Sequence, residues 1–266
     1  MNTNNQKITL LNITATLLIT VVWTSCALFA LKILVYYGGD ILHGKPEDWN
    51  KGLPGLYDEN YPITNSGIGF HFFAGAIILI LGSIQLIEGI RIRYINIHRW
   101  IGRVYVIACI ISAIGGLLFI FLKGTIGGPV MNIGFTGYGL AMLLCAILTI
   151  KFARAKQIDK HRAWAIRLYS LAIASWLYRQ QYGIVFMLGL DWPQQDFRGV
   201  FDYIMNFFFY IPNLFVAEFF IRAIYKNFPK WALYTGMVIL LLITVLLAVI
   251  AYLGNYRFVT WLFGME

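Results

Sequence analysis

Histidines are the residues of this sequence best suited to chemistry, and two of the four stand in a repeated motif. The stretches HRWIGRVYV and HRAWAIRLYS begin at His98 and His161, and each contains the pattern W-x-x-R-x-Y. A neutral imidazole can ligate a metal ion or exchange a proton near neutral pH. The repeat therefore predicts two equivalent positions for such chemistry, each with an arginine nearby, Arg103 in the first copy and Arg167 in the second.

The composition predicts that these motifs lie in a membrane protein. Hydrophobic residues make up 59% of the 266 residues and charged residues only 12%, too few to cover the surface of a soluble protein. The net charge of +9 would suit a nucleic-acid partner, but the basic residues fall in short clusters between apolar stretches. We therefore expect the lipid bilayer as the partner and no nucleic acid.

About seven apolar stretches are long enough to cross a hydrocarbon core about 30 Å thick as helices. They cover approximately residues 8–36, 67–87, 100–122, 133–150, 163–188, 201–224 and 231–253. Lysine and arginine collect in the connections on one side, which predicts that this side is cytoplasmic. The sequence thus predicts an all-α, polytopic helix bundle with the N-terminus inside and the C-terminus outside.

The same pattern predicts how the chain is organised within one integral membrane domain, residues 1–266. The second to fifth stretches carry small and polar residues at helical spacing, so residues 67–190 are expected to form a four-helix core with a polar-lined interior. Residues 37–66 are rich in Gly, Pro and acidic residues and predict an extracytoplasmic loop that covers this core. Pro212 predicts a kink in the sixth stretch, because proline removes a backbone donor.

An inner polar cluster follows from this topology. His98 and His161 both begin stretches that enter from the cytoplasm, so the two imidazoles are expected at similar depth. Gln85 ends the preceding stretch on the same side and is expected beside them.

An outer polar cluster is expected at the opposite surface. His71 begins a stretch that enters from outside, while Arg179 follows His161 on the same helix face and lies about 27 Å deeper. Tyr182 follows Arg179 by one helical turn. An arginine inside a membrane normally has a partner or faces a water-filled cavity, although snorkelling to the outer surface is an alternative.

Local spacing also predicts side-chain pairs within single helices. Glu218 stands four residues before Arg222, which favours an ion pair. Three tryptophans precede an arginine by three residues, which favours stacking of the guanidinium on the indole: Trp100, Trp164 and Trp176.

The two histidine motifs, the upstream stretch GFHFFAGAIILILGSIQL and the intervening GGPVMNIGF resemble a family of predicted bacterial membrane proteins, domain of unknown function 2306. This resemblance covers approximately residues 69–179 and implies a multi-pass protein of the bacterial cytoplasmic (inner) membrane, without a reaction. A weaker similarity is to cytochrome b561-type four-helix cores, in His71 with Gly75 and Gln85 and then His98. That similarity implies haem, although the fourth stretch has no histidine, so His98 and His161 are expected to hold one haem at most.

Three functions remain open from the sequence. The first is a transmembrane redox protein with one haem b, in which His98 and His161 are axial ligands and Arg103 or Arg167 pairs with the propionates. The second is a transporter or channel for an anion or a small polar solute, with His71 and Arg179 on the pathway. The third is a membrane-embedded enzyme that acts on a lipid or quinone, with His71 as acid or base. A membrane-protein partner or a homo-oligomer is the remaining expectation.

Overall fold

The computed structural model describes residues 3–193, 196–225 and 229–262, and every regular element in these ranges is helical. The elements are α1 (Thr3–Ile33), the π-helical turn η1 (Leu34–Gly38), α2 (Gly39–Leu42), the 3-10 turn η2 (Pro46–Asp48), α3 (Trp49–Gly52), α4 (Pro62–Ile84), α5 (Glu88–Arg93), α6 (Ile95–Leu122), α7 (Gly128–Arg154), α8 (Ile158–Ala172), α9 (Ala174–Met187), α10 (Val200–Phe208), α11 (Ile211–Tyr225) and α12 (Lys230–Leu262).

Six helical segments of the described chain are long and apolar enough to cross a membrane, which confirms the prediction of a polytopic helix bundle. They are Leu10–Leu42, Pro62–Ile84, Ile95–Leu122, Gly128–Arg154, Val200–Ala223 and Trp231–Gly254. The remaining expected span, 163–188, is divided at Ile173 into α8 and α9, each too short to count alone. The orientation of the termini in the membrane stays a prediction.

The discontinuity expected near Pro212 is confirmed. α10 ends at Phe208 and α11 begins at Ile211, so the sixth span consists of two helices. Proline has no N–H to continue the ladder of backbone hydrogen bonds, and its ring crowds the preceding turn. The break places Phe209, which is fully buried, against the core.

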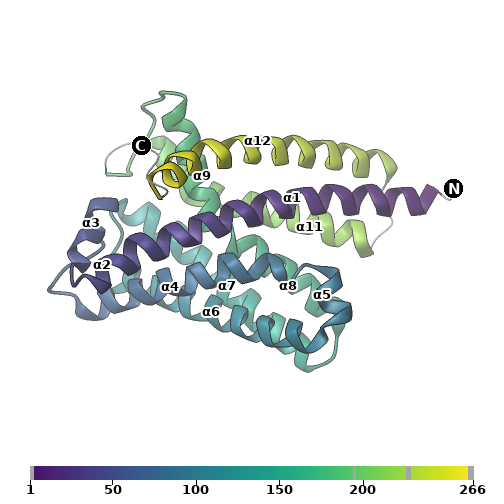
Figure 1. Cartoon of the computed structure of the whole chain (residues 1–266), viewed down its shortest axis with the longest axis horizontal. Coiled ribbons are helices and arrows are strands. Elements are labelled where there is room, and N and C mark those ends of the chain that lie inside the picture. Colours follow the sequence, from purple (N-terminus) through teal and green to yellow (C-terminus); the bar gives the residue numbers. More distant parts are fainter. Residues whose placement is uncertain (1–2, 194–195, 226–228, 263–266) are drawn as a thin grey trace.

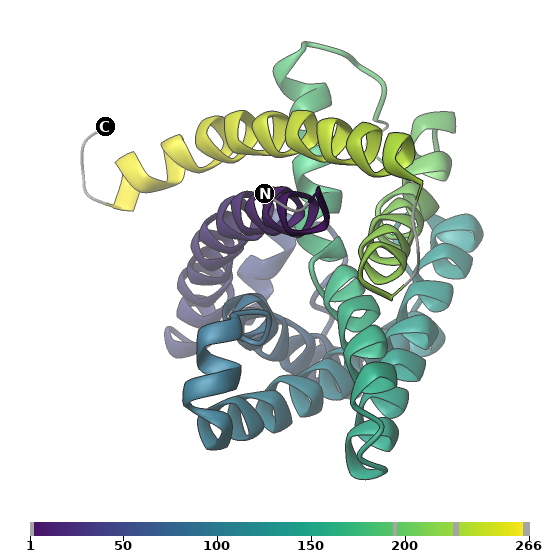
Figure 2. The same cartoon turned by 90° about the vertical axis from the view of Figure 1, so that its right-hand side faces the viewer.

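The main hydrophobic core lies inside the helix bundle. Its buried cluster draws residues from α4, α6, α7 and α8, with Leu168 and Leu171 fully buried. α4 packs closely on α6, and α7 on α8, while α1 and α12 lie side by side over this unit (Figure 1). In the view along the bundle, α12 arches over the other helices (Figure 2). α9 turns away from α8 and packs against α12.

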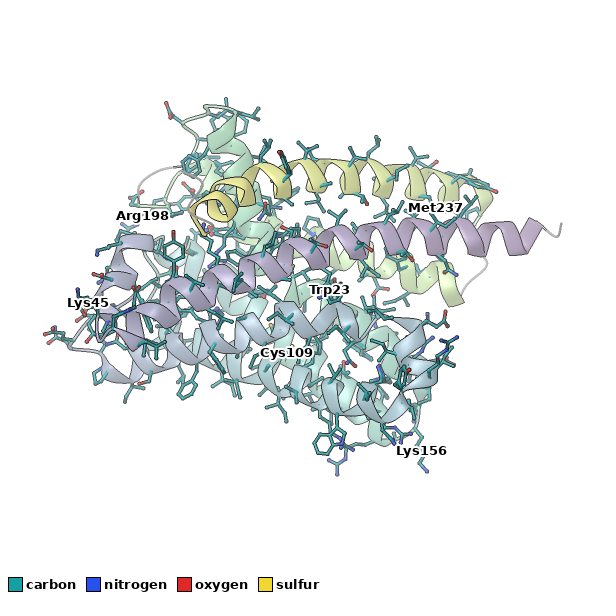
Figure 3. All side chains as sticks on the ribbon, in the orientation of Figure 1. Trp23, Lys45, Cys109, Lys156, Arg198 and Met237 are labelled. Atoms are coloured by element: carbon teal, nitrogen blue, oxygen red, sulfur yellow. The ribbon has the colours of Figure 1, made fainter. Side chains whose placement is uncertain are left out.

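The two ends of the bundle carry different connections, and we name them by the predicted topology. The outer end holds the segment 43–61 and the start of α10, with Lys45 and Arg198 (Figure 3). The inner end holds the connections after α4 and α7, with Lys156 (Figure 3).

The outer connection is shorter than the predicted loop of 37–66, because helical turns continue to Leu42 and α4 begins at Pro62. Trp49 from this connection is buried and donates its indole N–H to the Tyr37 carbonyl oxygen at 3.1 Å. Its ring also meets Phe72 of α4 edge-on, with 5.7 Å between centroids. The segment is therefore packed onto the ends of α1 and α4.

Candidate functional site

Close packing of α4 on α6 places His71 at the centre of the outer end. A Cβ added at Gly115 would overlap the carbonyl oxygen of Gly67, and one added at Gly116 would lie 3.2 Å from His71 Nδ1. Small residues at such positions let two backbones approach. The imidazole therefore lies directly against the α6 backbone.

The hydrogen bonds of His71 fix its tautomer. His71 Nδ1 lies 2.8 Å from the carbonyl oxygen of Ser112, and the Ser112 hydroxyl lies 3.1 Å from the same nitrogen. A carbonyl oxygen can only accept, so Nδ1 carries the proton in the neutral ring. Nε2 is then left with a lone pair that can accept a proton or a hydrogen bond.

Arg179 of α9 lies beside the same space. Its Nη1 donates to the Ser175 carbonyl oxygen at 2.8 Å, and its guanidinium lies 5.1 Å from the centre of the Phe29 ring on α1. Arg179 forms no ion pair with a carboxylate of the described residues. Arg179 is itself an exposed residue. The predicted stacking on Trp176 is wrong, because Trp176 is fully buried and donates to Ser25.

Two adjoining cavities contain the outer cluster. One has a volume of about 30 Å³ and the other of about 90 Å³. Both are lined by the same polar and sulfur-containing residues of α4, α6, α7 and α9, which are His71, Ser112, Tyr138, Met142, Ser175 and Arg179. The structure thus brings His71 and Arg179 together at one site, as the sequence predicted.

Tyr182 lies apart from these cavities. It is buried, and its hydroxyl donates to Asp202 Oδ1 of α10 at 2.6 Å. Its neighbour one turn earlier, Tyr178, lines the larger cavity and donates to the Tyr182 hydroxyl at 3.1 Å. Tyr182 therefore belongs to the outer cluster through Tyr178.

The inner cluster is held together by direct contacts. With its amide atoms assigned to match their neighbours, Gln85 donates to His98 Nδ1 at 3.3 Å and accepts from the Gly102 backbone N–H at 3.2 Å. A Cβ at Gly102 would lie 2.9 Å from an atom of the Gln85 side-chain amide. The absence of a side chain at Gly102 of α6 therefore leaves room for Gln85.

His161 is fixed by a different partner, although the two motifs look alike. Its Nδ1 lies 3.0 Å from the carbonyl oxygen of Thr149 on α7, which makes Nδ1 the protonated nitrogen. Of the predicted inner cluster, Gln85 thus contacts His98, whereas His161 makes its hydrogen bond to α7.

The arginines of the two motifs stack on tryptophan, as their spacing predicted. The guanidinium of Arg103 lies 5.0 Å from the centre of the Trp100 ring, and that of Arg167 lies 4.6 Å from the centre of the Trp164 ring. Such contacts suit a membrane boundary.

Arg167 also forms an ion pair that the sequence did not predict. Its Nη2 lies 2.6 Å from Glu218 Oε1 of α11. Glu218 was expected to pair with Arg222 on its own helix, and this expectation is wrong. Arg167 is therefore already paired with Glu218 of α11, so its charge is not available to a haem propionate.

The inner histidines do not fit an axial pair for haem as they are arranged. Each iron ligand must offer a lone pair on one ring nitrogen. His161 offers Nε2, because its Nδ1 is the donor to Thr149. His98 accepts from Gln85 at Nδ1, so its Nε2 carries the proton. Haem binding stays a prediction.

Sequence reasoning missed three side chains that line both cavities. Ser112 and Ser175 stand on the small and polar stripes of α6 and α9, so the stripes themselves were the signal. Tyr138 lies next to the stripe of α7 and donates its hydroxyl to the Leu171 carbonyl oxygen at 2.9 Å. The aromatic character of α7 gave no signal that this ring enters the site.

A comparison with protein families identifies the family of the chain. Residues 68–221 match the family described as "Predicted membrane protein (DUF2306)", which is more than half of the chain, and the chain belongs to this family. It is a multi-pass integral membrane protein. The match includes every residue that lines the larger cavity and both inner histidines. Neither a curated protein nor a solved structure matches the chain.

Proposed function

We propose that this protein binds a small anion in the two adjoining cavities and carries it through the polar-lined core. The observation that carries this proposal is Arg179, a cation that lines both cavities without a carboxylate partner among the described residues. A charge at membrane depth is costly unless an opposite charge or water stabilises it. An anion beside Arg179 supplies that charge.

A second group at the cavities supports an anion as the ligand. His71 lines both cavities together with Arg179. His71 completes the site, because its Nε2 becomes a donor when it takes up a proton.

The size of the cavities favours small anions. The cavities of about 90 Å³ and about 30 Å³ together hold several water molecules, since one water needs about 10–15 Å³ of cavity volume. Nitrate and formate fit this description, whereas a quinone ring with its tail does not. We take nitrate as the probe.

Polar side chains continue from the cavities towards the inner end and support a path through the core. The hydroxyl of Tyr105 is buried, and the Ser83 hydroxyl lies 2.8 Å from that of Tyr169. The rings of Tyr105 and Tyr169 pack on Gly82, which has no side chain to separate them. Gln85 directly follows the end of α4, and His98 lies two turns before Tyr105 on α6.

The proposal is tested by nitrate flux into proteoliposomes that contain an anion-quenched fluorescent protein. We expect purified protein to admit nitrate faster than empty vesicles do, and the substitution Arg179→Gln to slow this flux about tenfold, the loss expected for a hydrogen bond to a charged group. Arg198→Gln is the matched control, because Arg198 is exposed, lies at the same end and lines neither cavity.

Two outcomes would overturn the proposal. One is wild-type flux no faster than that of empty vesicles. The other is an Arg179→Gln protein that keeps the wild-type rate, because the guanidinium would then only snorkel to the surface.

Haem b at His98 and His161 is the second function that the sequence favours, because both histidines lie near the start of a helix at the inner end. The hydrogen bond from Gln85 to His98 opposes it. A reduced-minus-oxidised spectrum of protein purified after growth with haem precursor separates the two. A b-type α band that is lost in His161→Ala supports haem, and its absence from the wild-type protein contradicts it.

A further inference from the structure

A row of three hydrogen-bonded side chains leads from the larger cavity towards the outer end. Tyr178 lines the cavity and donates to the hydroxyl of Tyr182 at 3.1 Å, and Tyr182 donates to Asp202 Oδ1 at 2.6 Å. The other carboxylate oxygen of Asp202 accepts from the Gly199 backbone N–H at 3.0 Å. The row thus joins the cavity to the first turn of α10.

The direction of these hydrogen bonds follows from the chemistry of the carboxylate. An ionised Asp202 can only accept, so the Tyr182 hydroxyl must donate to it. The Tyr182 oxygen is then free to accept, and Tyr178 supplies that hydrogen. Every hydroxyl in the row therefore points away from the cavity and towards Asp202.

Aromatic rings enclose the row. Tyr182 is 6% exposed and Asp202 is fully buried. The Tyr182 ring meets Phe201 edge-on at 5.3 Å between centroids, and Tyr178 meets Phe135 at 5.5 Å. Hydrogen bonds in such a dry environment are stronger than in water, and bulk water does not replace them.

We infer that Tyr178, Tyr182 and Asp202 form a proton path between the cavity and the outer end, so that the anion moves together with a proton. This inference rests on the proposed transport of an anion. A proton that accompanies a monovalent anion makes the net charge moved zero, which lowers the cost of crossing the hydrocarbon core.

The transfer balances in protons. In the outward direction the His71 imidazolium gives the proton on Nε2 to a water in the cavity, and that water passes a proton to the Tyr178 oxygen. Tyr178 passes its own proton to the Tyr182 oxygen, and Tyr182 passes its own to the Asp202 carboxylate. One N–H bond breaks and one carboxyl O–H bond forms, while both tyrosines end neutral. The reverse sequence brings a proton into the cavity with the anion.

Charged and titratable groups face both ends of the path. At the cavity end, the Arg179 guanidinium of α9 and the Tyr138 phenol of α7 share the lining with His71. At the other end, Asp202 faces the phenols of Tyr178 and Tyr182 on α9. Where α7 packs on α10, Gly134 contacts Asn206, and neither residue is charged.

A purely structural role for Asp202 is the alternative, because its carboxylate also caps the start of α10. The experiment therefore compares two kinds of nitrate movement in the same proteoliposomes. One is net uptake driven by a pH gradient with the outside acid, and the other is exchange of labelled external nitrate for internal nitrate at equal pH, which moves no net proton. A structural defect lowers both rates together. Loss of the proton path lowers only the net uptake driven by the pH gradient.

We expect the pH gradient to drive nitrate uptake by the wild-type protein. Tyr182→Phe should lower that rate about tenfold or more, as for loss of a positioned proton carrier, and should keep the wild-type rate of nitrate exchange. Tyr203→Phe, a partly exposed tyrosine of α10, is the matched control and should behave as wild type. Tyr178→Phe is the second variant if Tyr182→Phe does not fold, and the same selective loss is expected.

Each outcome decides one of the two proposals. Wild-type uptake that ignores the pH gradient, or Tyr182→Phe and Tyr178→Phe proteins that retain pH-driven uptake, overturns the proton path and leaves the anion transporter standing. Wild-type protein that shows neither net nitrate uptake nor nitrate exchange overturns anion transport, and the proton path with it.

Discussion

The outer and inner ends of the bundle use the same residue types in opposite ways. At the inner end, Arg167 is paired with Glu218, and His98 is bound by Gln85. At the outer end, Arg179 has no carboxylate partner in the described chain, and His71 shares a cavity with it. A charge whose partner comes from the protein stabilises the fold, whereas a charge that faces a cavity is available to a ligand.

The glycines of α4 divide in the same way. Gly82 is packed by Tyr105 and Tyr169, so a side chain there would meet two rings. Gly75 lines the smaller cavity and has nothing within 4 Å of an added Cβ. One small-residue stripe therefore serves helix packing near the inner end and open space near the outer end.

The largest expected effect comes from the helix contact that positions the outer site. Gly115→Leu forces a side chain into the carbonyl oxygen of Gly67, and we expect a loss of about 3 kcal/mol in stability, at the upper end for overpacking. Thermal unfolding in detergent measures it. Gly183→Ala, where nothing lies within 4 Å of the added Cβ, should leave the midpoint unchanged. Equal midpoints for the two variants would contradict close packing at Gly115.

The ion pair of the inner end should give the next largest effect. Glu218→Gln leaves Arg167 partly buried without its partner, because the Arg167 side chain is 22% exposed and that of Glu218 is 34% exposed. We expect a loss of about 2 kcal/mol in stability, less than the roughly 3–5 kcal/mol for breaking a fully buried pair. The double variant with Arg167→Gln should recover part of this loss.

The exposed pair of Glu88 and Arg91 provides the control for that measurement. The Glu88 side chain is 69% exposed and that of Arg91 is 36% exposed, so Glu88→Gln should lower the stability by less than about 0.5 kcal/mol. If Glu218→Gln is equally harmless, the partnered charges of the inner end do not stabilise the fold, and the contrast between the ends fails.

A smaller effect tests whether the two ends are independent. Gln85→Leu removes the hydrogen bonds to His98 and Gly102, and we expect a loss of about 1 kcal/mol in stability. Arg179 lies at the other end, so nitrate binding, followed as the shift of the unfolding midpoint with nitrate, should stay as in the wild-type protein. A lost nitrate shift in Gln85→Leu would show that the ends are coupled.

The smallest effect concerns the pH response of the outer connection. Hydrogen bonds from Asn60, first from its backbone N–H, and the charge of Lys123 hold the pKa of Asp58 below its ordinary value. A depressed pKa means that this stabilisation is present above the ordinary value, about 3.9, and is lost as the pH falls below it. A spin label at Glu59→Cys should gain mobility below about pH 4.

The substitution Asp58→Asn is the control for that titration. It removes the charge that Lys123 Nζ meets at 3.5 Å, so the label should be equally mobile at all pH values between 3 and 7, the range about the ordinary pKa of aspartate. A wild-type label whose mobility does not change with pH would contradict the contribution of Asp58.

Several features that depend on one helix were predictable from the sequence. The apolar stretches predicted the spans, and Pro212 predicted the break between α10 and α11. A spacing of three residues predicted the stacking of Arg103 on Trp100, since residues three or four apart share a helix face. The same spacing failed for Trp176 and Arg179, because the Trp176 indole is bound to Ser25 of another helix.

Contacts between helices were decided only by the tertiary structure. The sequence placed His71 and Arg179 at similar depth, but the cavity they share also depends on Ser112 and Tyr138 from two other helices. Glu218 has one basic candidate on its own helix, and the rotation of α11 against α8 turns it to Arg167 instead.

The sequence by itself therefore determined a multi-pass helix bundle and the depth of its polar residues. Tertiary structure decided which of these residues are bound to each other and which face a cavity. The physical reason is that helical periodicity fixes neighbours along one helix, whereas neighbours across helices depend on rotation and spacing, which glycines such as Gly115 set.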